Sequence, residues 1–432
     1  MLDIKFIREN IEIVKNAAKN KRVDFDVDEL LALDERRRHV LQELEGKRAK
    51  QNAGSKGGPK SPVELEELKK LKEEVKILEE EISHVQHDFD EMMMRVPNIP
   101  SQDTPVGKDE NDNKVLREVG KIPAFDFKPK EHWELGSQLG TIDTETASKV
   151  SGARFAYLKD GFAIIQFALI QFVLSVLINE KTLKKIIKNA RLDIGTKPFT
   201  LVVPPVFIKP EIFQKMARLE PREERYHIVS DDLYLIGSAE HTLGAMHMDE
   251  ILTPEQLPVR YIGYSTAFRR EAGSYGKDMK GILRLHQFDK LEMESFTLPE
   301  DSVKEQDFFV AIQEYIMQLL GVPYRVVQIC TGDMAAPDAR QIDIESWMPG
   351  QGRYRETHTA DLMTDYQARR LNTKVKRADK TEFIHMNDAT AVAIGRTIIA
   401  IVENYQTKNG TVKIPKVLQK YTFGIKEIKS HF

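Results

Sequence analysis

The chain has 432 residues, of which 41% are hydrophobic and 30% are charged, so it can bury one large core and a smaller accessory unit. This composition predicts a soluble globular protein of two domains. The formal net charge of -3 excludes a general attraction to polyanions, and any binding of nucleic acid must come from local clusters of Lys and Arg.

The first residues, MLDIKFIREN, mix charged and apolar side chains and lack the basic-then-apolar plan of a secretory signal. The single cysteine is Cys330, so an intramolecular disulfide framework and a cysteine-based zinc site are excluded. Both features predict a cytosolic protein.

Two segments with heptad spacing predict a long helical hairpin at about residues 28–96. Over residues 65–92 the apolar positions alternate steps of three and four, which is the spacing of a coiled-coil seam. Residues 28–51 carry a similar pattern, and the turn-forming stretch AGSKGGPKSP at residues 53–62 separates the two segments. Helices joined by so short a turn lie antiparallel.

The hairpin has two interpretations. It can be a coiled coil for dimerisation or for binding a partner, which the spacing alone favours. It can also be an arm that lies along an extended RNA, with basic residues near its tip contacting phosphates. The candidates for those contacts are Lys47, Arg48, Lys50, Lys56 and Lys60.

The polar, turn-rich stretch at residues 107–115 predicts a boundary between an N-terminal domain, residues 1–108, and a larger domain, residues 109–432. The most apolar run of the larger domain, residues 162–178, is interrupted by Gln166, Gln171 and Ser175. It is also shorter than the roughly 20 residues that a bilayer requires, so we expect a buried core helix.

Strands are predicted at residues 233–236, 259–268, 282–288, 324–329 and 342–348. Several of them are consecutive, and they do not alternate regularly with helices as βαβ units do. The larger domain is therefore predicted to be α+β, with an antiparallel β-sheet flanked by helices.

Residues 266–294, TAFRREAGSYGKDMKGILRLHQFDKLEME, read as a strand, a glycine-bearing loop and a second strand. Alternation along the second strand places Phe288, Lys290 and Glu292 on one face and Leu285 on the opposite face. The loop contains Gly273, Ser274 and Gly276.

The residue types of this hairpin suit a nucleotide. Arg269 and Arg270 end the first strand, and Arg offers a planar, permanently charged fork to phosphate oxygens. Phe288 offers a face on which a purine can stack. From spacing alone, a nucleotide site and a surface hairpin with ordinary ion pairs remain equal alternatives.

The form FRREAGSYGKD followed by HQFDKLE resembles motif 2 of class II aminoacyl-tRNA synthetases, and in particular that of the seryl-tRNA synthetase family. Residues 395–406, GRTIIAIVENYQ, resemble motif 3, and residues 202–207, VVPPVF, resemble the end of motif 1. The similarity extends over nearly the whole chain. It implies a class II antiparallel sheet and an N-terminal tRNA-binding domain with a coiled-coil arm.

The resemblance also implies an activity and partners. The chain is expected to activate L-serine with ATP and to transfer the seryl group to the 3′ end of tRNA(Ser), and also of tRNA(Sec). A homodimer with motif 1 in its interface is expected. Because the serine carboxylate attacks the α-phosphorus in line, the enzyme has to supply positioning and charge stabilisation rather than a nucleophile.

For ATP, the resemblance implies that Arg269 holds the α-phosphate, that Glu271 contacts the adenine end and that Phe288 stacks on the base. Arg396 is implied to reach the γ-phosphate, and Arg269, Glu271 and Arg396 are the implied catalytic residues. The full implied ATP-binding set is Arg269, Arg270, Glu271, Leu285, Phe288, Glu356, Thr357, His358, Thr359 and Arg396.

Mg²⁺ ligands and a serine pocket are implied as well. Glu356 and Thr359 occupy the positions of the metal ligands and offer the hard oxygen atoms that Mg²⁺ prefers. A pocket built to hydrogen-bond a substrate hydroxyl rejects an analogue without it by factors of about 10⁴ or more. The residues implied to bind serine are Ser238, Ala239, Glu240, Glu292 and Thr390.

The sequence departs from the family pattern around this pocket. After Glu356 the family usually reads Ile-Ser-Ser-Cys-Ser-Asn, whereas residues 357–362 of this chain read THTADL. The common Asn-Gly-Ser ahead of motif 3 is replaced by Asp-Ala-Thr at residues 388–390, and the proline before Thr-x-Glu is Gly237. Hydroxyl groups are kept at Thr359 and Thr390, so the ATP site is expected to be intact, and the departures concern the affinity for serine.

Three other functions fit parts of the sequence: an inactive paralogue that binds RNA, a ligase that loads a small amino acid onto a carrier protein, and a coiled-coil interaction protein. The first predicts the loss of Arg269, Glu271 or Arg396, the second predicts no long arm, and the third leaves the nucleotide residues without a purpose. None of these expectations matches the sequence.

The spacing of the histidines does not indicate a zinc site. His286 and His385 lie in strand-like contexts and are predicted to be structural. His241 and His247 lack the His-Glu-x-x-His spacing of a zinc site.

Overall fold

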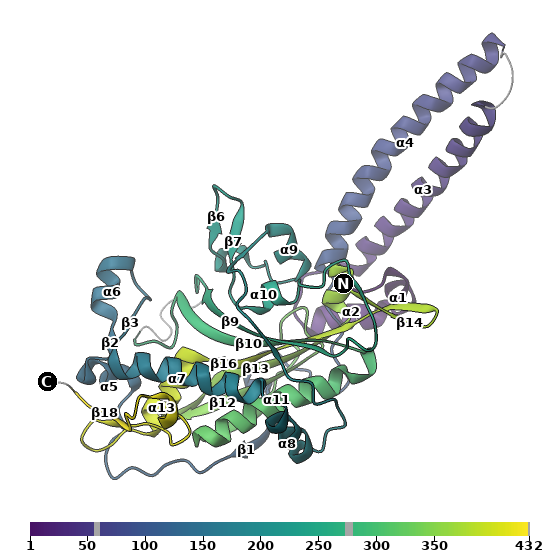
Figure 1. The fold of residues 1–432 in the computed structure, drawn as a ribbon. Coiled ribbons are helices and arrows are strands. Elements are labelled where there is room, and N and C mark those ends of the chain that lie inside the picture. The colour runs from purple at the N-terminus through teal and green to yellow at the C-terminus, as the bar shows by residue number, and fades with distance from the viewer. Residues whose placement is uncertain (56–60, 273–279, 431–432) are drawn as a thin grey trace. The chain divides into compact units, whose positions relative to one another are not determined.

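The structure is a computed structural model that describes residues 1–55, 61–272 and 280–430 (Figure 1). The chain divides into two compact units, Met1–Ile99 and Pro100–Phe432. The predicted domain boundary at residue 108 therefore falls inside the second unit. The hydroxyl groups of Ser101 and Thr104 each donate to the carbonyl of Ala339 at 3.0 Å, and these bonds make the segment part of the second unit.

The first unit is helical, and its long helices α3 and α4 form the predicted antiparallel hairpin, which is thereby confirmed (Figure 1). Buried side chains at heptad spacing, among them Val40, Leu44, Val75 and Leu78, pack between the two helices. The helices are α1 (Ile4–Glu9), α2 (Ile11–Asn20), α3 (Val27–Ser55) and α4 (Pro62–Arg95).

Ion pairs also join α3 to α4. Lys47 lies 3.0 Å from Glu74, and Arg48 lies 2.7 Å from Glu79, measured between the charged nitrogen and oxygen atoms. Two of the predicted phosphate-binding side chains thus share their charge with acids of the opposite helix. Lys50 is exposed, and the predicted Lys56 and Lys60 lie outside the described residues.

The second unit is built on an eight-stranded sheet with the order β1-β11-β12-β13-β16-β10-β9-β4. Strand β4 pairs in parallel with β9 at one edge, and the other neighbours pair antiparallel. This confirms the predicted antiparallel sheet. The strands are β1 (Lys114–Val119), β4 (Thr200–Val202), β9 (Val259–Phe268), β10 (Gln287–Thr297), β11 (Tyr324–Gln328), β12 (Arg340–Met348), β13 (Arg353–Thr364) and β16 (His385–Ala393).

Helices cover one face of this sheet (Figure 1). Helices α11 (Ser302–Leu320) and α13 (Ile394–Asn404) pack directly on the strands, α8 (Glu180–Ala190) lies against α11, and α7 (Asp160–Leu177) lies against α13. The strands turn apolar side chains toward the helices, among them Leu291, Met293, Ala360 and Ala389. The opposite face of these strands is left for polar side chains, because neighbouring residues of a strand alternate between faces.

Helix α7 contains the apolar run that was predicted to be a core helix. It is long and apolar enough to cross a membrane, but half of it is buried inside the second unit. Phe162, Leu169 and Phe172 belong to the main core of the unit. The burial of these side chains accounts for the hydrophobicity of the run without a bilayer.

Shorter elements complete the second unit. Strands β5 (Phe207–Ile208), β7 (Leu233–Leu235) and β6 (His227–Ile228) form a small sheet, as do β15 (Lys380–Phe383), β14 (Lys374–Arg377) and β8 (Ile251–Leu252). The pairs β2 (Ile142–Asp143) with β3 (Tyr157–Leu158) and β17 (Val412–Lys413) with β18 (Glu427–Ile428) are two-stranded. The remaining helices are α5 (His132–Leu139), α6 (Thr144–Ser151), α9 (Pro210–Lys215), α10 (Glu240–Leu243) and α12 (Tyr366–Leu371), with 3-10 turns η1 (Glu110–Asp112), η2 (Arg222–Glu224), η3 (Pro299–Asp301) and η4 (Gln419–Tyr421).

The strand predicted at residues 282–288 is wrong over residues 282–286. Residues 281–286 form turns and bends, and β10 begins only at Gln287. The reason lies in α5, where the ring Nε2 of His132 accepts a hydrogen bond from the backbone N–H of Ile282 at 3.2 Å. That N–H is therefore not available to a neighbouring strand.

Candidate active site

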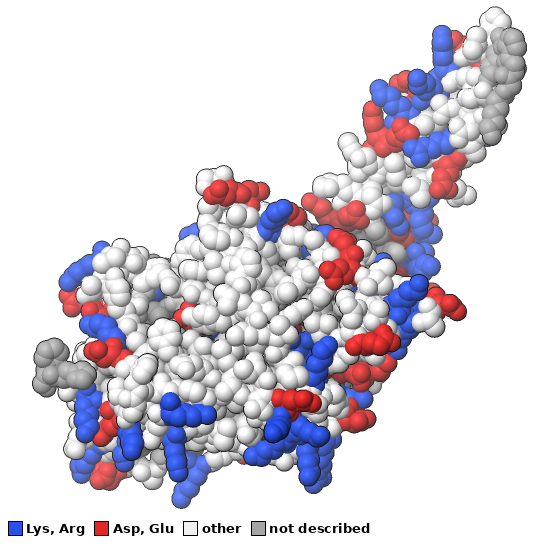
Figure 2. All heavy atoms as spheres, viewed as in Figure 1, with Lys and Arg blue, Asp and Glu red and all other residues white. Residues whose placement is uncertain are grey.

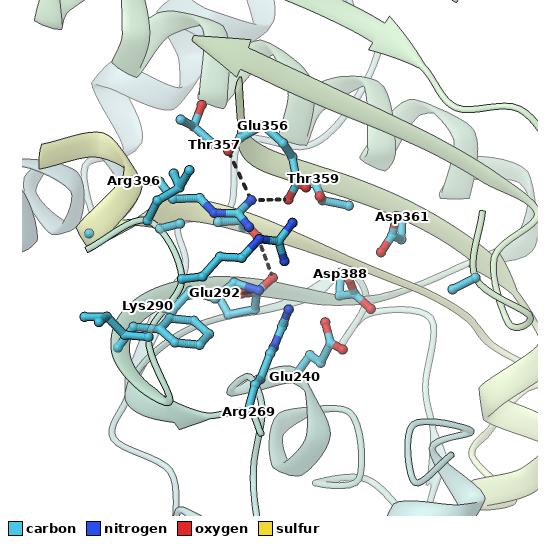
Figure 3. Close-up of a pocket in the computed structure, with 18 of the residues that line it drawn as sticks. Glu240, Arg269, Lys290, Glu292, Glu356, Thr357, Thr359, Asp361, Asp388 and Arg396 are labelled. Atoms are coloured by element: carbon cyan, nitrogen blue, oxygen red, sulfur yellow. Dashed lines mark hydrogen bonds and ion pairs between the residues drawn. The ribbon is translucent and has the colours of Figure 1, made fainter. Parts of the chain in front are cut away.

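A cavity of about 230 Å³ opens on the face of the sheet that the helices leave uncovered (Figure 3). Strand β10 contributes Phe288, Lys290 and Glu292, which alternate with the core-facing Leu291 and Met293. The end of β9 and the residues before β10 add further side chains, and β12, β13, β16, α10 and the start of α13 complete the wall.

Two β-bulges bring residues three apart into the same cavity. The pairing of β12 with β13 shifts between Ile344 and Glu345, so that both Glu356 and Thr359 reach the cavity. The pairing of β10 with β16 shifts in the same way beside Glu292, so that both Thr390 and Ala393 face the cavity. Regular alternation would have turned one member of each pair toward the helices.

The outer part of the cavity gathers cations around an aromatic ring. The guanidinium carbon of Arg269 lies 5.5 Å from the centre of the Phe288 ring, and its Nε donates to the carbonyl of Gly237 at 3.2 Å. Neither contact neutralises the charge of Arg269, which remains available to an anion. Arg284 and Arg396 line the same space.

Two of these cations are held by carboxylates. Arg284 donates to Glu271 at 3.0 Å, and Arg396 lies 2.9 Å from Glu356, as Figure 3 shows for the latter pair. Although burial alone would raise it, Arg396 holds the pKa of Glu356 below its ordinary value. Glu271 has a φ of 52°, a strained conformation for a residue with a side chain and one that is frequent at functional sites.

Deeper in the cavity, Glu292 receives hydrogen bonds from three side chains. Lys290 lies 2.6 Å from one of its oxygens (Figure 3). Ser238 donates to Glu292 at 3.1 Å, and Thr390 donates at 3.4 Å. Lys290 also donates to the hydroxyl of Ser238 at 3.2 Å. Burial raises the pKa of Glu292, while the charge of Lys290 opposes that rise.

The deeper part of the cavity also contains an ionic network that was not predicted from the sequence. Arg218 lies within ion-pair distance of Glu240 (3.1 Å), Asp388 (3.2 Å), Asp338 (3.5 Å) and Asp361 (3.6 Å). We call the part of the cavity lined by Arg218, Lys290 and the carboxylates of Glu240, Glu292, Asp338, Asp361 and Asp388 the inner pocket.

Burial and mutual repulsion disturb the acids of the inner pocket. Burial, together with Asp338 and Asp388, raises the pKa of Asp361 well above its ordinary value, and burial together with Glu240 raises that of Asp388. Glu240 differs from these two acids, because Arg218 overcomes the effect of burial and holds the pKa of Glu240 well below the ordinary value. Two of these acids, Asp361 and Asp388, were visible in the sequence as departures from the family pattern, but Arg218 and Asp338 gave no signal.

Most of the predicted site residues line the cavity, and four do not. Ser238 is buried and reaches the site only through its hydrogen bonds with Glu292 and Lys290. Arg270 turns to Tyr226, whose ring centre lies 5.8 Å from its guanidinium carbon. His358 is buried on the other side of β13, where its Nδ1 lies 2.9 Å from the Thr357 hydroxyl and burial lowers its pKa to about 3. Ala239 is buried before α10, behind the cavity wall.

The remaining predictions are placed as follows. Leu285 lines the same cavity as Phe288, contrary to the alternation argument, because it precedes the strand and alternation does not apply to it. Thr357 lines the cavity although its hydroxyl donates to the backbone carbonyl of Ile344. The predicted loop residues Gly273, Ser274 and Gly276 lie outside the described part of the chain.

The donor set suits Mg²⁺ in the outer part of the cavity. Glu356 offers a carboxylate and Thr359 a hydroxyl, and the bulge in β13 directs both toward the same space. A metal ion at this position would share Glu356 with Arg396. Cations beside an aromatic face, next to hard oxygen ligands, form a site for a polyphosphate that carries a base.

Comparison with known proteins gives the family. Residues 225–405 match the family described as tRNA synthetase class II core domain (G, H, P, S and T), and residues 1–100 match that described as seryl-tRNA synthetase N-terminal domain. A protein of Thermodesulfovibrio yellowstonii named serine--tRNA ligase is 40% identical over 435 residues, which cover 98% of each chain.

Solved structures agree. The crystal structure of seryl-tRNA synthetase from Pyrococcus horikoshii complexed with ATP has a TM-score of 0.90, is 39% identical and covers 100% of both chains. That of cytoplasmic serine-tRNA ligase from Naegleria fowleri in complex with AMP has a TM-score of 0.85, is 31% identical and covers 100% of this chain and 99% of its own. By its sequence, its domains and its fold, the chain belongs to the seryl-tRNA synthetase family.

Proposed function

We propose that the protein activates L-serine with ATP and transfers the seryl group to the 3′ end of tRNA(Ser) and, in a cell that has one, of tRNA(Sec). The observation that carries this proposal is that a cationic cleft floored by Phe288 opens directly into a pocket where Glu292 is surrounded by hydroxyl groups. The family membership supports the same reaction.

In this proposal the outer part of the cavity binds ATP. The base stacks on Phe288, Glu271 meets the adenine end, and Arg269 and Arg396 take the α- and γ-phosphates. The relative from Pyrococcus horikoshii was solved with ATP, which supports a nucleotide at this place. Mg²⁺ held by Glu356 and Thr359 would neutralise phosphate charge.

Serine binds next to the nucleotide, with its hydroxyl facing Glu292 and Thr390. Because Glu292 is buried and surrounded by donors, an amino acid without a polar side chain would leave hydrogen-bonding groups unpaired. The serine carboxylate then attacks the α-phosphorus, and Arg269 stabilises the charge that develops on the phosphate oxygens. The chain supplies position and charge, and the step uses no nucleophile from the protein.

The hairpin of α3 and α4 is proposed to bind the tRNA. Figure 2 shows both signs of charge along this hairpin, and the ion pairs of Lys47 and Arg48 agree with that mixture. Phosphates would have to compete with Glu74 and Glu79 for these cations. Such contacts are weakened by salt, because binding to phosphate releases counterions.

A homodimer is proposed through the edge of the sheet at β4. Leu201 of β4 and Val203, which follows the strand directly, are exposed there, and the second side of β4 has no partner strand among the described residues. Exposed apolar side chains on a sheet edge favour association with another chain. We also expect the protein in the cytosol, which agrees with the name of the cytoplasmic relative from Naegleria fowleri.

The test is ATP–pyrophosphate exchange measured with each of the twenty amino acids in turn. Serine should support exchange at a rate well above the others, and purified tRNA(Ser) should then accept labelled serine. Exchange that depends on another amino acid, with none for serine, would refute the proposed substrate.

A further inference from the structure

We propose that the inner pocket also accepts a short amino acid whose side chain ends in an ammonium group, of the 2,3-diaminopropionate type, and that the enzyme activates it with ATP. This inference rests on the proposed function, because it assigns a second substrate class to the same adenylation site.

The charges of the inner pocket are not balanced. Its carboxylates outnumber Arg218 and Lys290, the cations among the described residues that line it. The α-ammonium group of any amino acid supplies one positive charge. The ammonium of a side chain supplies a second one in the same place.

Three acidic residues lie in one row across neighbouring strands of the sheet. Asp361 of β13 lies opposite Asp388 of β16, and Asp388 lies opposite Glu294 of β10. Ionised carboxylates directly opposite each other repel and destabilise a sheet, so a positive charge beside Asp361 and Asp388, in addition to that of Arg218, stabilises the row. Asp361 and Asp388 are also two of the positions at which the sequence departs from the usual family pattern.

Asp361 presents an oxygen that the protein itself does not use. Its side chain is only 8% exposed and lines the cavity, and its Oδ2 lies 3.6 Å from Arg218. Its Oδ1 is buried and has no hydrogen-bond partner. A buried acceptor of this kind is costly unless a ligand donates to it, and a charged donor gives the stronger bond.

The size of the pocket fits the same class of ligand. 2,3-Diaminopropionate differs from serine only in having an amino group in place of the hydroxyl, so it needs no more room than serine does. Its side-chain ammonium group can form ion pairs with the carboxylates that line the pocket.

The reaction is the same as with serine. A carboxylate oxygen of the amino acid forms a bond to the α-phosphorus of ATP, and the bond from that phosphorus to the bridging oxygen breaks. Pyrophosphate leaves with the bonding electrons. The side-chain ammonium keeps its proton throughout.

The first experiment uses the wild-type protein and three amino acids of matched size: serine, 2,3-diaminopropionate and 2-aminobutyrate, which has a methyl group in the same place. We expect pyrophosphate exchange with 2,3-diaminopropionate to exceed that with 2-aminobutyrate by at least about ten-fold, as a paired charge requires. If serine supports exchange but 2,3-diaminopropionate supports no more exchange than 2-aminobutyrate does, this inference alone is overturned. Absence of exchange with all three overturns the proposed function as well.

The second experiment restores the neutral residues of the family, in Asp361→Ser and Asp388→Asn. The measured quantity is the ratio of kcat/KM for 2,3-diaminopropionate to kcat/KM for serine, which partial misfolding does not change because it scales both values equally. We expect this ratio to fall by at least about ten-fold in each variant. Glu345→Gln is the control, since it removes a carboxylate that pairs with Arg325 outside the cavity, and should leave the ratio unchanged. An unchanged ratio in both restored variants overturns the inference.

A divalent cation is the competing occupant, because oxygens of Glu240, Glu292 and Asp388 all lie within 4.8 Å of one another. Arg218 and Lys290 already contact these carboxylates, which favours an ammonium over a metal that needs its own shell of oxygens. Metal analysis after dialysis decides between them. Zinc or manganese retained at one ion per chain, and lost in Asp388→Asn, would overturn the inference.

Discussion

Among single residues, Arg269 has the contacts expected of a group that meets a phosphate, and Arg270 beside it does not. Arg269→Ala is expected to lower the kcat of serine-dependent pyrophosphate exchange by about 10² to 10³, the usual effect of removing one preorganised charge from a transition state. Arg270→Ala is the matched control, because its guanidinium group lies over Tyr226 outside the cavity. Equal losses in the two variants would contradict the assignment of Arg269.

Glu294 gives a prediction about pH. It is fully buried, neither of its oxygens has a hydrogen-bond partner, and burial with the charge of Asp388 raises its pKa well above the ordinary 4.5. The folded protein therefore holds a proton that the unfolded chain releases, so this group contributes stability below about pH 4.5 and loses that contribution as pH rises toward its folded pKa.

In the variant Glu294→Gln the side chain cannot ionise, so the loss of folding stability with rising pH should disappear. Above neutral pH the variant is expected to be more stable than the wild type by on the order of 1–3 kcal/mol, and the difference should grow with pH. Thermal unfolding midpoints measured at about pH 6 and about pH 8.5 would check this. A wild-type protein that is more stable than the variant at the higher pH would contradict it.

The sequence predicted individual site residues where chemistry and spacing agree, and failed where a residue acts only through its partners. Arg269, Phe288 and Glu292 are recognisable from their own motif. Arg218 is not, since its importance arises from acids that lie far away in the sequence and meet only in the folded sheet.

Among elements, the hairpin of α3 and α4 separates the two proposed activities. All the proposed ATP and serine residues lie in the second unit, so shortening the hairpin should leave exchange intact. Replacing residues 44–78 by a short Gly/Ser turn is expected to lower the kcat/KM of tRNA charging by about 100-fold or more, equivalent to about 3 kcal/mol of lost binding.

This shortened variant keeps the base of the hairpin. The buried Asp34, which pairs with Arg8, Arg37 and Arg38, remains in place. Circular dichroism and the exchange assay with serine serve as the control for folding. Normal charging by the shortened protein would show that the hairpin does not bind the tRNA.

The long helices and strand β9 could be predicted because their periodicity is regular over many residues. Strands β13 and β16 could not, since bulges and polar, cavity-facing residues such as Glu356 and Asp388 interrupt the alternation that identifies a strand. The sequence thus predicted the periphery of the site better than its centre, where function sets the residue choice.

For the whole molecule, the proposed dimer predicts that the mass in solution is twice the mass of one chain. Two copies of a 49.6 kDa chain should appear by light scattering at twice that mass, independent of dilution in the micromolar range. Val203→Asp places a charge on the exposed sheet edge and is expected to shift the population toward the single-chain mass. A wild-type protein that runs at 49.6 kDa would contradict the dimer.

The pairing of β1 with β11 has a consequence for biosynthesis. Val119 and Tyr324 are partners in this pairing, so the first strand leaves the ribosome long before the second one exists. At about 5–20 residues per second the delay is roughly 10–40 s. The helical hairpin needs no such delay, because its contacts lie within Met1–Ile99. During translation β1 is therefore a strand that a chaperone has time to hold before its partner exists.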